Sequence, residues 1–82
     1  MMDDVKEAVK RAHDYLKSLD MQVHDVRLEE VELSGDEERW RVTLSYREAA
    51  GGPESINPRI YKAFQIRRSD GSVLSMKIRQ LQ

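Results

Sequence analysis

The hydrophobic residues of this chain change their spacing once, near residue 22, and this change limits the possible folds more than any other feature of the sequence. Between residues 5 and 19 they recur at intervals of three and four, as on one side of an α-helix. After residue 22 they recur at intervals of two, as on one face of a β-strand. The sequence therefore predicts one helix followed by a sheet.

Asp4 and Glu7 mark the beginning of the predicted helix, because an Asp followed three residues later by a Glu is typical of a capping box. The apolar stripe of the helix comprises Val5, Ala8, Val9, Ala12, Leu16 and Leu19. Asp20 does not continue this stripe, so we expect the helix to end between residues 18 and 21. The stripe is about 100° wide, which is enough to cover one face of a sheet.

Alternation of apolar and polar residues predicts four strands, over residues 26–33, 39–47, 60–66 and 74–78. The positions expected to face the helix are Val26, Leu28, Val31, Leu33, Trp40, Val42, Leu44, Tyr46, Ile60, Phe64, Ile66, Leu74, Met76 and Ile78, with Lys62 as the one charge among them. The alternation of the first strand slips by one residue at Glu29–Glu30, which predicts a β-bulge there.

The connections between these strands predict how the strands pair. Residues 34–38 form a polar turn, and Asp70–Gly71 is a hairpin signal. Residues 48–58 are rich in Gly and Pro and predict a longer loop. Consecutive strands joined by short connections usually pair as neighbours. We therefore predict a single α+β domain over residues 1–82, with one N-terminal helix packed on a four-stranded antiparallel meander sheet (α-β-β-β-β).

The composition excludes several classes of protein. None of the 82 residues is cysteine, so the chain holds no disulfide, thiolate metal site or cysteine nucleophile. Acidic residues near the first position, and the lack of a long apolar run, predict neither a signal peptide nor a membrane-spanning helix. We therefore expect a cytoplasmic protein with no membrane association and no cofactor.

The net charge of −1 conceals an uneven distribution. Residues 1–38 contain 5 basic and 12 acidic side chains, whereas residues 39–82 contain 9 basic and 3 acidic ones. The outward positions of the later strands include Arg39, Arg41, Arg47, Arg59, Tyr61, Arg67, Lys77 and Arg79. These positions predict a basic, polar sheet face that the helix leaves open. Pairing with Glu29, Glu30 and Glu32 across the strands would explain much of this basic content without any ligand.

The residues that commonly carry catalysis are not arranged for it in this sequence. His13 and His24 lack a third ligand at a fixed spacing, so a metal site is not expected. A triad of Ser45, His24 and Asp25 has neither a nucleophile elbow nor a Gly-rich oxyanion loop. Adjacent carboxylates such as Glu29–Glu30 point to opposite faces of a strand. We therefore predict that the protein is not an enzyme and has no catalytic or metal-binding residues.

Most of the chain resembles the PepSY-type module, a family with a helix, strands and a closing strand pair. The residues that carry the resemblance are Val31-Glu32-Leu33, Trp40-Arg41-Val42-Thr43-Leu44, Tyr61-Lys62-Ala63-Phe64-Gln65-Ile66 and Asp70-Gly71-Ser72-Val73-Leu74. The second half of the chain is similar to the gas-vesicle accessory protein O family, which pairs a Trp-x-Val strand with a Tyr-containing strand. Either resemblance implies a small binding, inhibitory or assembly module and no catalytic residues.

The functional expectation is a non-catalytic interaction module. We expect a protein partner to bind through the open sheet face and the loop over residues 48–58. The predicted partner-binding residues are Arg41, Tyr61, Arg67, Lys77 and Arg79. The alternative is binding of single-stranded nucleic acid on the same face, with a ring stacked on a base and guanidiniums on phosphates.

Two further possibilities follow from the predicted fold. A small molecule or peptide would fit between helix and sheet, near His13, Trp40 and Tyr46, if the core were incompletely packed. An edge strand, either the first or the fourth, offers a way for two copies to pair. We therefore expect either a monomer or a homodimer formed by edge-strand pairing.

Overall fold

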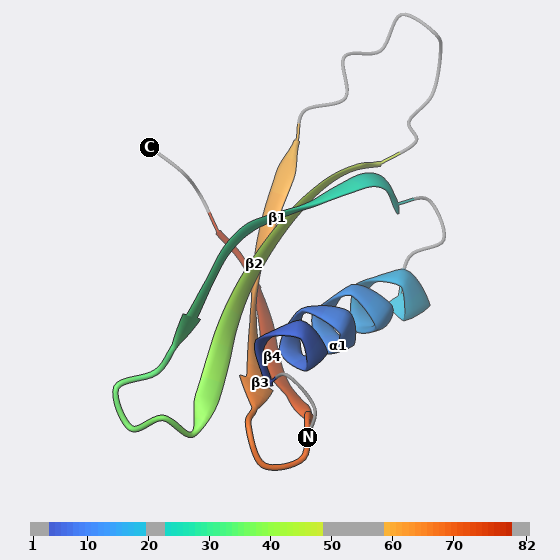
Figure 1. The fold of residues 1–82 in the computed structure, drawn as a ribbon. Helices are drawn as coiled ribbons and strands as arrows, with labels where there is room; N and C mark the ends of the chain where they lie inside the picture. The colour runs from blue at the N-terminus through green and yellow to red at the C-terminus, as the bar shows by residue number, and fades with distance from the viewer. Residues whose placement is uncertain (1–3, 20–22, 49–58, 80–82) are drawn as a thin grey trace, which may run out of the picture.

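The computed structural model describes residues 4–19, 23–48 and 59–79. They form helix α1 (Asp4–Leu19) and strands β1 (Val23–Leu33), β2 (Arg39–Glu48), β3 (Ile60–Arg67) and β4 (Val73–Ile78) (Figure 1). The strands form one antiparallel sheet in the order β1-β2-β3-β4. The predicted α+β architecture, one helix followed by a four-stranded meander, is therefore confirmed.

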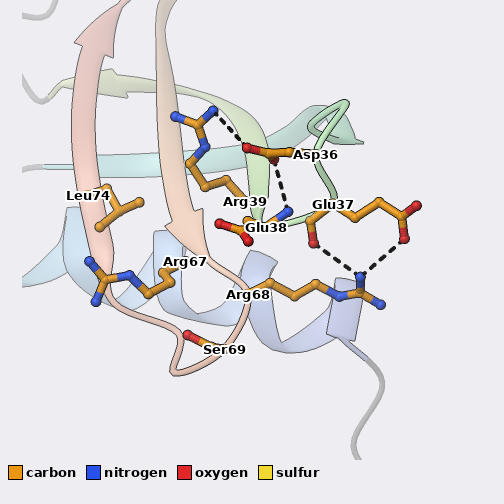
Figure 2. A pocket seen from close by; sticks show the side chains of 8 residues that line it. All are labelled: Asp36, Glu37, Glu38, Arg39, Arg67, Arg68, Ser69 and Leu74. Atoms are coloured by element: carbon orange, nitrogen blue, oxygen red, sulfur yellow. Dashed lines mark hydrogen bonds and ion pairs between the residues drawn. The ribbon is translucent and has the colours of Figure 1, made fainter.

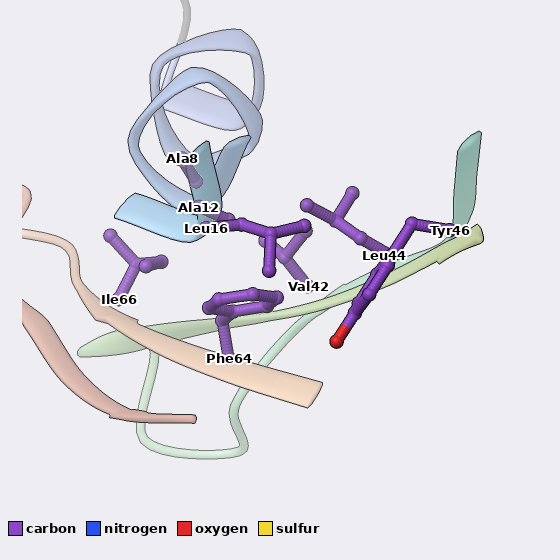
Figure 3. Close-up of a cluster of buried hydrophobic side chains, with 8 residues drawn as sticks. All are labelled: Ala8, Ala12, Leu16, Val42, Leu44, Tyr46, Phe64 and Ile66. Atoms are coloured by element: carbon purple, nitrogen blue, oxygen red, sulfur yellow. The ribbon is translucent and has the colours of Figure 1, made fainter. Parts of the chain in front are cut away.

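The core lies between α1 and the two central strands. Its buried side chains are Ala8, Ala12, Leu16, Val42, Leu44, Tyr46, Phe64 and Ile66 (Figure 3). Phe64 has no exposed surface, and its ring meets the ring of Tyr15 edge-on, with 6.5 Å between the centroids. Small side chains at Ala8 and Ala12 allow the helix to lie close to the sheet. Most of the predicted helix stripe and the predicted alternation of β2 therefore meet in a single cluster, whereas Leu19, at the end of the stripe, is 55% exposed.

Strand β1 departs from regular pairing at two places. Leu28 pairs with Leu44 and Glu30 with Thr43, which leaves Glu29 as the extra residue of the bulge that the sequence predicts. A second register shift follows His24. It contains Asp25, whose φ of 55° lies in the left-handed region that Asp adopts more readily than most residues. Alternation alone does not indicate this second shift.

The predicted burial of the edge strands is wrong at three positions. Leu28, Leu74 and Ile78 are 50%, 39% and 69% exposed. Strands lie about 4.8 Å apart and a helix is about 10–12 Å wide, so a single helix covers about two of the four strands. A register irregularity also places Val73 opposite Ile66 and leaves Leu74 displaced from the helix-facing side.

The two tight turns lie at the same end of the sheet (Figure 1). In the β3–β4 turn, the amide of Ser72 donates to Oδ1 of Asp70 (2.9 Å), which holds the pKa of that carboxyl below its usual value. In the β1–β2 turn, the hydroxyl of Ser34 donates to Oδ1 of Asp36 (2.5 Å) and lowers the pKa of Asp36 in the same way. Within the described ranges, no helix is both long and apolar enough to span a membrane.

Replacing Phe64 with alanine tests the position of the core. Phe64 is 0% exposed, and we expect Phe64→Ala to lower the free energy of unfolding by about 3–5 kcal/mol, from lost burial and the cavity left behind. Leu28→Ala, at a side chain that is 50% exposed, serves as the control and should cost less than about 1 kcal/mol. Urea unfolding followed by circular dichroism measures both. Equal losses would contradict the core described above.

Gly71 occupies a backbone conformation that other residues rarely adopt. Its φ is 75°, and an added Cβ would lie 3.0 Å from Nε of Arg11. We therefore expect Gly71→Ala to cost about 1–2 kcal/mol in the free energy of unfolding. Gly35→Ala is the matched control, because nothing lies within 4 Å of its added Cβ. Thermal melts that shift equally for the two variants would show that the left-handed turn is not required.

Candidate interaction surface on the open face of the sheet

The open face is the side of the sheet that α1 does not cover. The strand pairing arranges most of its side chains in three rows that run across the whole sheet from β1 to β4, and Arg39 lies opposite Arg67 at the turn end. The three rows are Glu32–Arg41–Gln65–Ser75, Glu30–Thr43–Ala63–Lys77 and Arg27–Ser45–Tyr61–Arg79. In the third row, the amide of Arg79 donates to the carbonyl of Tyr61 (2.9 Å). Two of the rows therefore have an acidic side chain at their β1 end, and two have a basic side chain at their β4 end.

Ser45 is completely buried on this face, because other polar side chains cover it. Nη1 of Arg59 donates to Oγ of Ser45 (2.8 Å) and to the carbonyl of Asp25 (3.0 Å), and its other amino group binds the Asp25 carboxylate. The hydroxyl of Ser45 in turn donates to Oε2 of Glu29 (2.5 Å). Asp25, at the first register break of β1, and Ser45 of β2 thus supply the acceptors that hold Arg59.

Thr43 is buried in the same way beneath Arg79. Nη1 of Arg79 donates to Oε1 of Glu30 (2.6 Å) and to Oγ1 of Thr43 (2.9 Å). The side chain of Arg79 therefore crosses β3 and reaches the far edge of the sheet. Ala63 lies between Thr43 and Lys77 in its row, and its small side chain leaves room for this crossing.

These contacts change the expected character of the face. The predicted cross-strand pairing is confirmed for Arg41, whose Nη1 lies 3.4 Å from Oε1 of Glu32. It is wrong for Arg39, which pairs with Asp36 in the adjoining turn at 3.7 Å. The face is a layer of paired charges rather than a broad basic surface.

A hollow of about 290 Å³ lies on the β3–β4 side of the open face. It is lined by Arg41, Ala63, Gln65, Ser75, Lys77, Ile78 and Arg79. Ala63 and Ser75 are its small side chains, whereas Arg41, Lys77 and Arg79 bring three cations to it. Lys77 has no ion pair with any residue that the structure describes. The hollow therefore offers one cation whose charge is free.

Three of the five predicted partner-binding residues, Arg41, Lys77 and Arg79, thus line one hollow. Tyr61 lies on the same face but outside the hollow, and it is half-buried. Arg67 lies at the turn end of the sheet, where it stands opposite Arg39 and pairs with Asp70 at 3.3 Å. Residues 49–58, most of the predicted loop contact, lie outside the described residues.

A larger hollow of about 700 Å³ lies at the turn end of the sheet, between the two tight turns (Figure 2). Its lining residues are Asp36, Glu37, Glu38, Arg39, Arg67, Arg68, Ser69 and Leu74. Three carboxylates and three guanidiniums balance there, and Arg68 lies 3.7 Å from Glu37. This hollow therefore has no excess charge with which to select a charged ligand.

Two of the side chains considered for catalysis, Ser45 and Asp25, are engaged in structural contacts. Ser45 is buried and its hydroxyl donates to Glu29, while Asp25 binds Arg59. His24 is exposed and lies opposite Arg47 in the register of β1 and β2. In the part of the chain that the structure describes, no three His, Asp or Glu side chains gather as metal ligands would.

Comparison of the chain with protein-family models, curated proteins and solved structures found no match. The resemblances to PepSY-type modules and to gas-vesicle accessory protein O therefore stay predictions. The functional argument depends on the geometry of the open face.

The sequence indicated part of this site. Alternation alone places Arg41 and Lys77 on one face, and it lists Arg59 among the outward residues. What sequence reasoning missed is the burial of Thr43 and Ser45, since both are polar and lie on the outward side. Sequence reasoning also missed the left-handed conformation of Asp25. Its carboxylate binds Arg59, which is 34 residues away, and no local pattern indicates such a contact.

Arg59 and Arg47 both approach Asp25, and they provide a test of the buried layer. The Arg59 side chain is 11% exposed and makes three polar contacts, whereas Arg47 is 47% exposed and lies 3.8 Å from the carboxylate. We expect Arg59→Met to cost about 1.5–3 kcal/mol of unfolding free energy, because it removes the hydrogen bonds of a charged group that is itself nearly buried. Arg47→Met should cost less than about 1 kcal/mol. Urea unfolding distinguishes them, and similar losses would contradict a structural role for Arg59.

Proposed function

We propose that this protein is a non-catalytic interaction module that binds an acidic segment of a partner protein at the hollow of the open face. The observation that carries the proposal is the position of Lys77 on a hollow that it shares with Arg41 and Arg79. Two of these cations are already held by carboxylates of β1, but Lys77 is not. A carboxylate entering the hollow would meet Lys77 without displacing an existing ion pair.

The size of the hollow supports a side chain rather than a larger ligand. About 290 Å³ accommodates one or two amino-acid side chains, and it lies at the lower end of the range of about 300–1,000 Å³ that is typical of pockets for whole small molecules. Small residues at Ala63 and Ser75 make the depression, and the long side chains around it make the rim. A glutamate or aspartate of a partner fits this combination of depth and charge.

The charge layout favours a protein partner over single-stranded nucleic acid. A bound strand needs a continuous cationic track for its phosphates and exposed rings for its bases. The carboxylates of Glu30 and Glu32 interrupt such a track, since they lie in the same rows as the cations. Tyr61 is half-buried between neighbouring strands. The resemblance to PepSY-type modules, which implies a small binding module, agrees with this choice. We also propose a cytoplasmic location, as expected for a cysteine-free domain.

A chemical-shift titration of the ¹⁵N-labelled protein tests the proposal. We expect a disordered Glu-rich peptide to shift the amides of Arg41, Ala63 and Lys77. Lys77→Glu should weaken binding about tenfold or more, because it replaces the free cation with a like charge. Lys17→Glu makes the same charge change on an exposed residue of α1 and should leave binding unchanged.

The same titration with a mixed single-stranded RNA and DNA pool, at about 50 mM and about 200 mM salt, separates the two kinds of ligand. Salt-sensitive shifts on the open face with the nucleic acids, and none with the peptide, would replace the proposal with nucleic-acid binding. Silence with both ligands would overturn an interaction site in this hollow.

A further inference from the structure

The outer edge of β4 has no strand beside it among the described residues (Figure 1). The amide of Arg79 donates to the carbonyl of Tyr61 (2.9 Å), so the backbone groups of Arg79 and Lys77 point toward β3. The groups of the alternate residues, Met76 and Ile78, therefore point away from the sheet. Unpaired amides and carbonyls along a strand form a template for another strand.

The opposite edge of the sheet is protected against such pairing. Strand β1 breaks its register after His24 and again at Glu29, and each break interrupts the spacing that an added strand would need. Asp25 is left-handed, and Glu30 and Glu32 add charge along the edge. Of the two edges, β4 is therefore the one prepared for pairing, since its residues from 75 to 78 pair regularly with β3.

The two faces of the β4 edge have different chemistry. On the helix side, Ile78 is 69% exposed and Met76 is partly buried against the core. On the open face, Lys77 and Arg79 flank the hollow. Because successive side chains of a strand point to opposite faces, a strand added beside β4 would place alternate residues against apolar and basic surface.

We propose that the β4 edge binds an extended segment of a partner protein in which carboxylate and apolar side chains alternate. This inference rests on the function proposed above and adds how the acidic segment binds. The segment would become a fifth strand, with backbone hydrogen bonds to Met76 and Ile78. Its carboxylates would meet Lys77, and its apolar side chains would cover Ile78.

Charge complementarity favours this occupant over a second copy of the chain. Antiparallel pairing of two β4 strands would bring the Lys77 side chains of both copies onto the same face, where like charges destabilise the pair. An acidic strand makes an opposite-charge contact at the same position. The exposed Ile78 side chain is covered in either case, so the charge on the open face decides between them.

Two peptides of identical composition test the inference. In one, Glu and Val alternate, and in the other the same residues stand in two blocks, so both carry the same charge. We expect the alternating peptide to bind at least about tenfold more tightly, as measured by fluorescence anisotropy. On binding, the amides of Met76 and Ile78 should become protected from hydrogen exchange.

Two substitutions at Ile78 distinguish the contribution of its backbone amide to peptide binding from the contribution of its side chain. Ile78→Pro removes the outward amide at an exposed edge position, where proline is tolerated. Ile78→Thr keeps that amide and removes apolar surface. We expect Ile78→Pro to reduce binding of the alternating peptide by about tenfold or more, and Ile78→Thr to reduce it less. Circular dichroism melts confirm that both variants are folded, and Lys77→Glu provides a third variant with an unchanged backbone.

The outcomes separate this inference from the proposed function. If both peptides bind equally and Ile78→Pro has no effect, while Lys77→Glu abolishes binding, the hollow binds acidic segments and the edge inference is wrong. If neither peptide binds, both proposals fail. If sedimentation without peptide shows a dimer that Ile78→Pro dissociates, a second copy occupies the edge and the acidic-strand inference is overturned.

Discussion

One helix must cover a sheet of four strands, and the rest of the structure depends on this mismatch in width. Helix α1 buries the central strands, with Phe64 and Val42 completely enclosed. It covers the outer strands only in part, since Val31 and Met76 pack against the core while Leu28 and Ile78 stay exposed, and it leaves the whole opposite face without an apolar cover. A small domain has little other hydrophobic surface with which to close that face. The remaining stabilisation on that side has to come from polar side chains.

The two long arginines meet this requirement. Arg59 and Arg79 lie across the open face and bury the hydroxyls of Ser45 and Thr43, so β2 is covered on both sides near its middle. Each hydroxyl has a charged donor within hydrogen-bond distance, which avoids the cost of an unsatisfied buried polar group. On this face, a single layer of polar side chains therefore buries the middle of β2.

The local pattern of the sequence predicts most of the backbone, because helix stripes, strand alternation and turn chemistry act over a few residues. The bulge at Glu29 was predictable for the same reason, since a slipped alternation has no other regular solution. The irregularity near Leu74 was not, because Val73 and Leu74 are both apolar and either one can face the helix. The positions of Arg59 and Arg79 depend on partners 34 and 49 residues away, so no local pattern indicates them.

These long-range contacts explain why the first half of the sequence is acidic and the second half is basic. The acidic first half supplies β1, and the basic second half supplies Arg59 and Arg79, so opposite charges join the first strand to the last part of the sheet. Such contacts form only when the meander is complete, because they close long loops. Pairing neutralises the cations that can reach β1. Lys77 lies farthest from β1 in its row and stays unpaired among the described residues, so the geometry that closes the open face also leaves a free positive charge beside an unpaired strand edge.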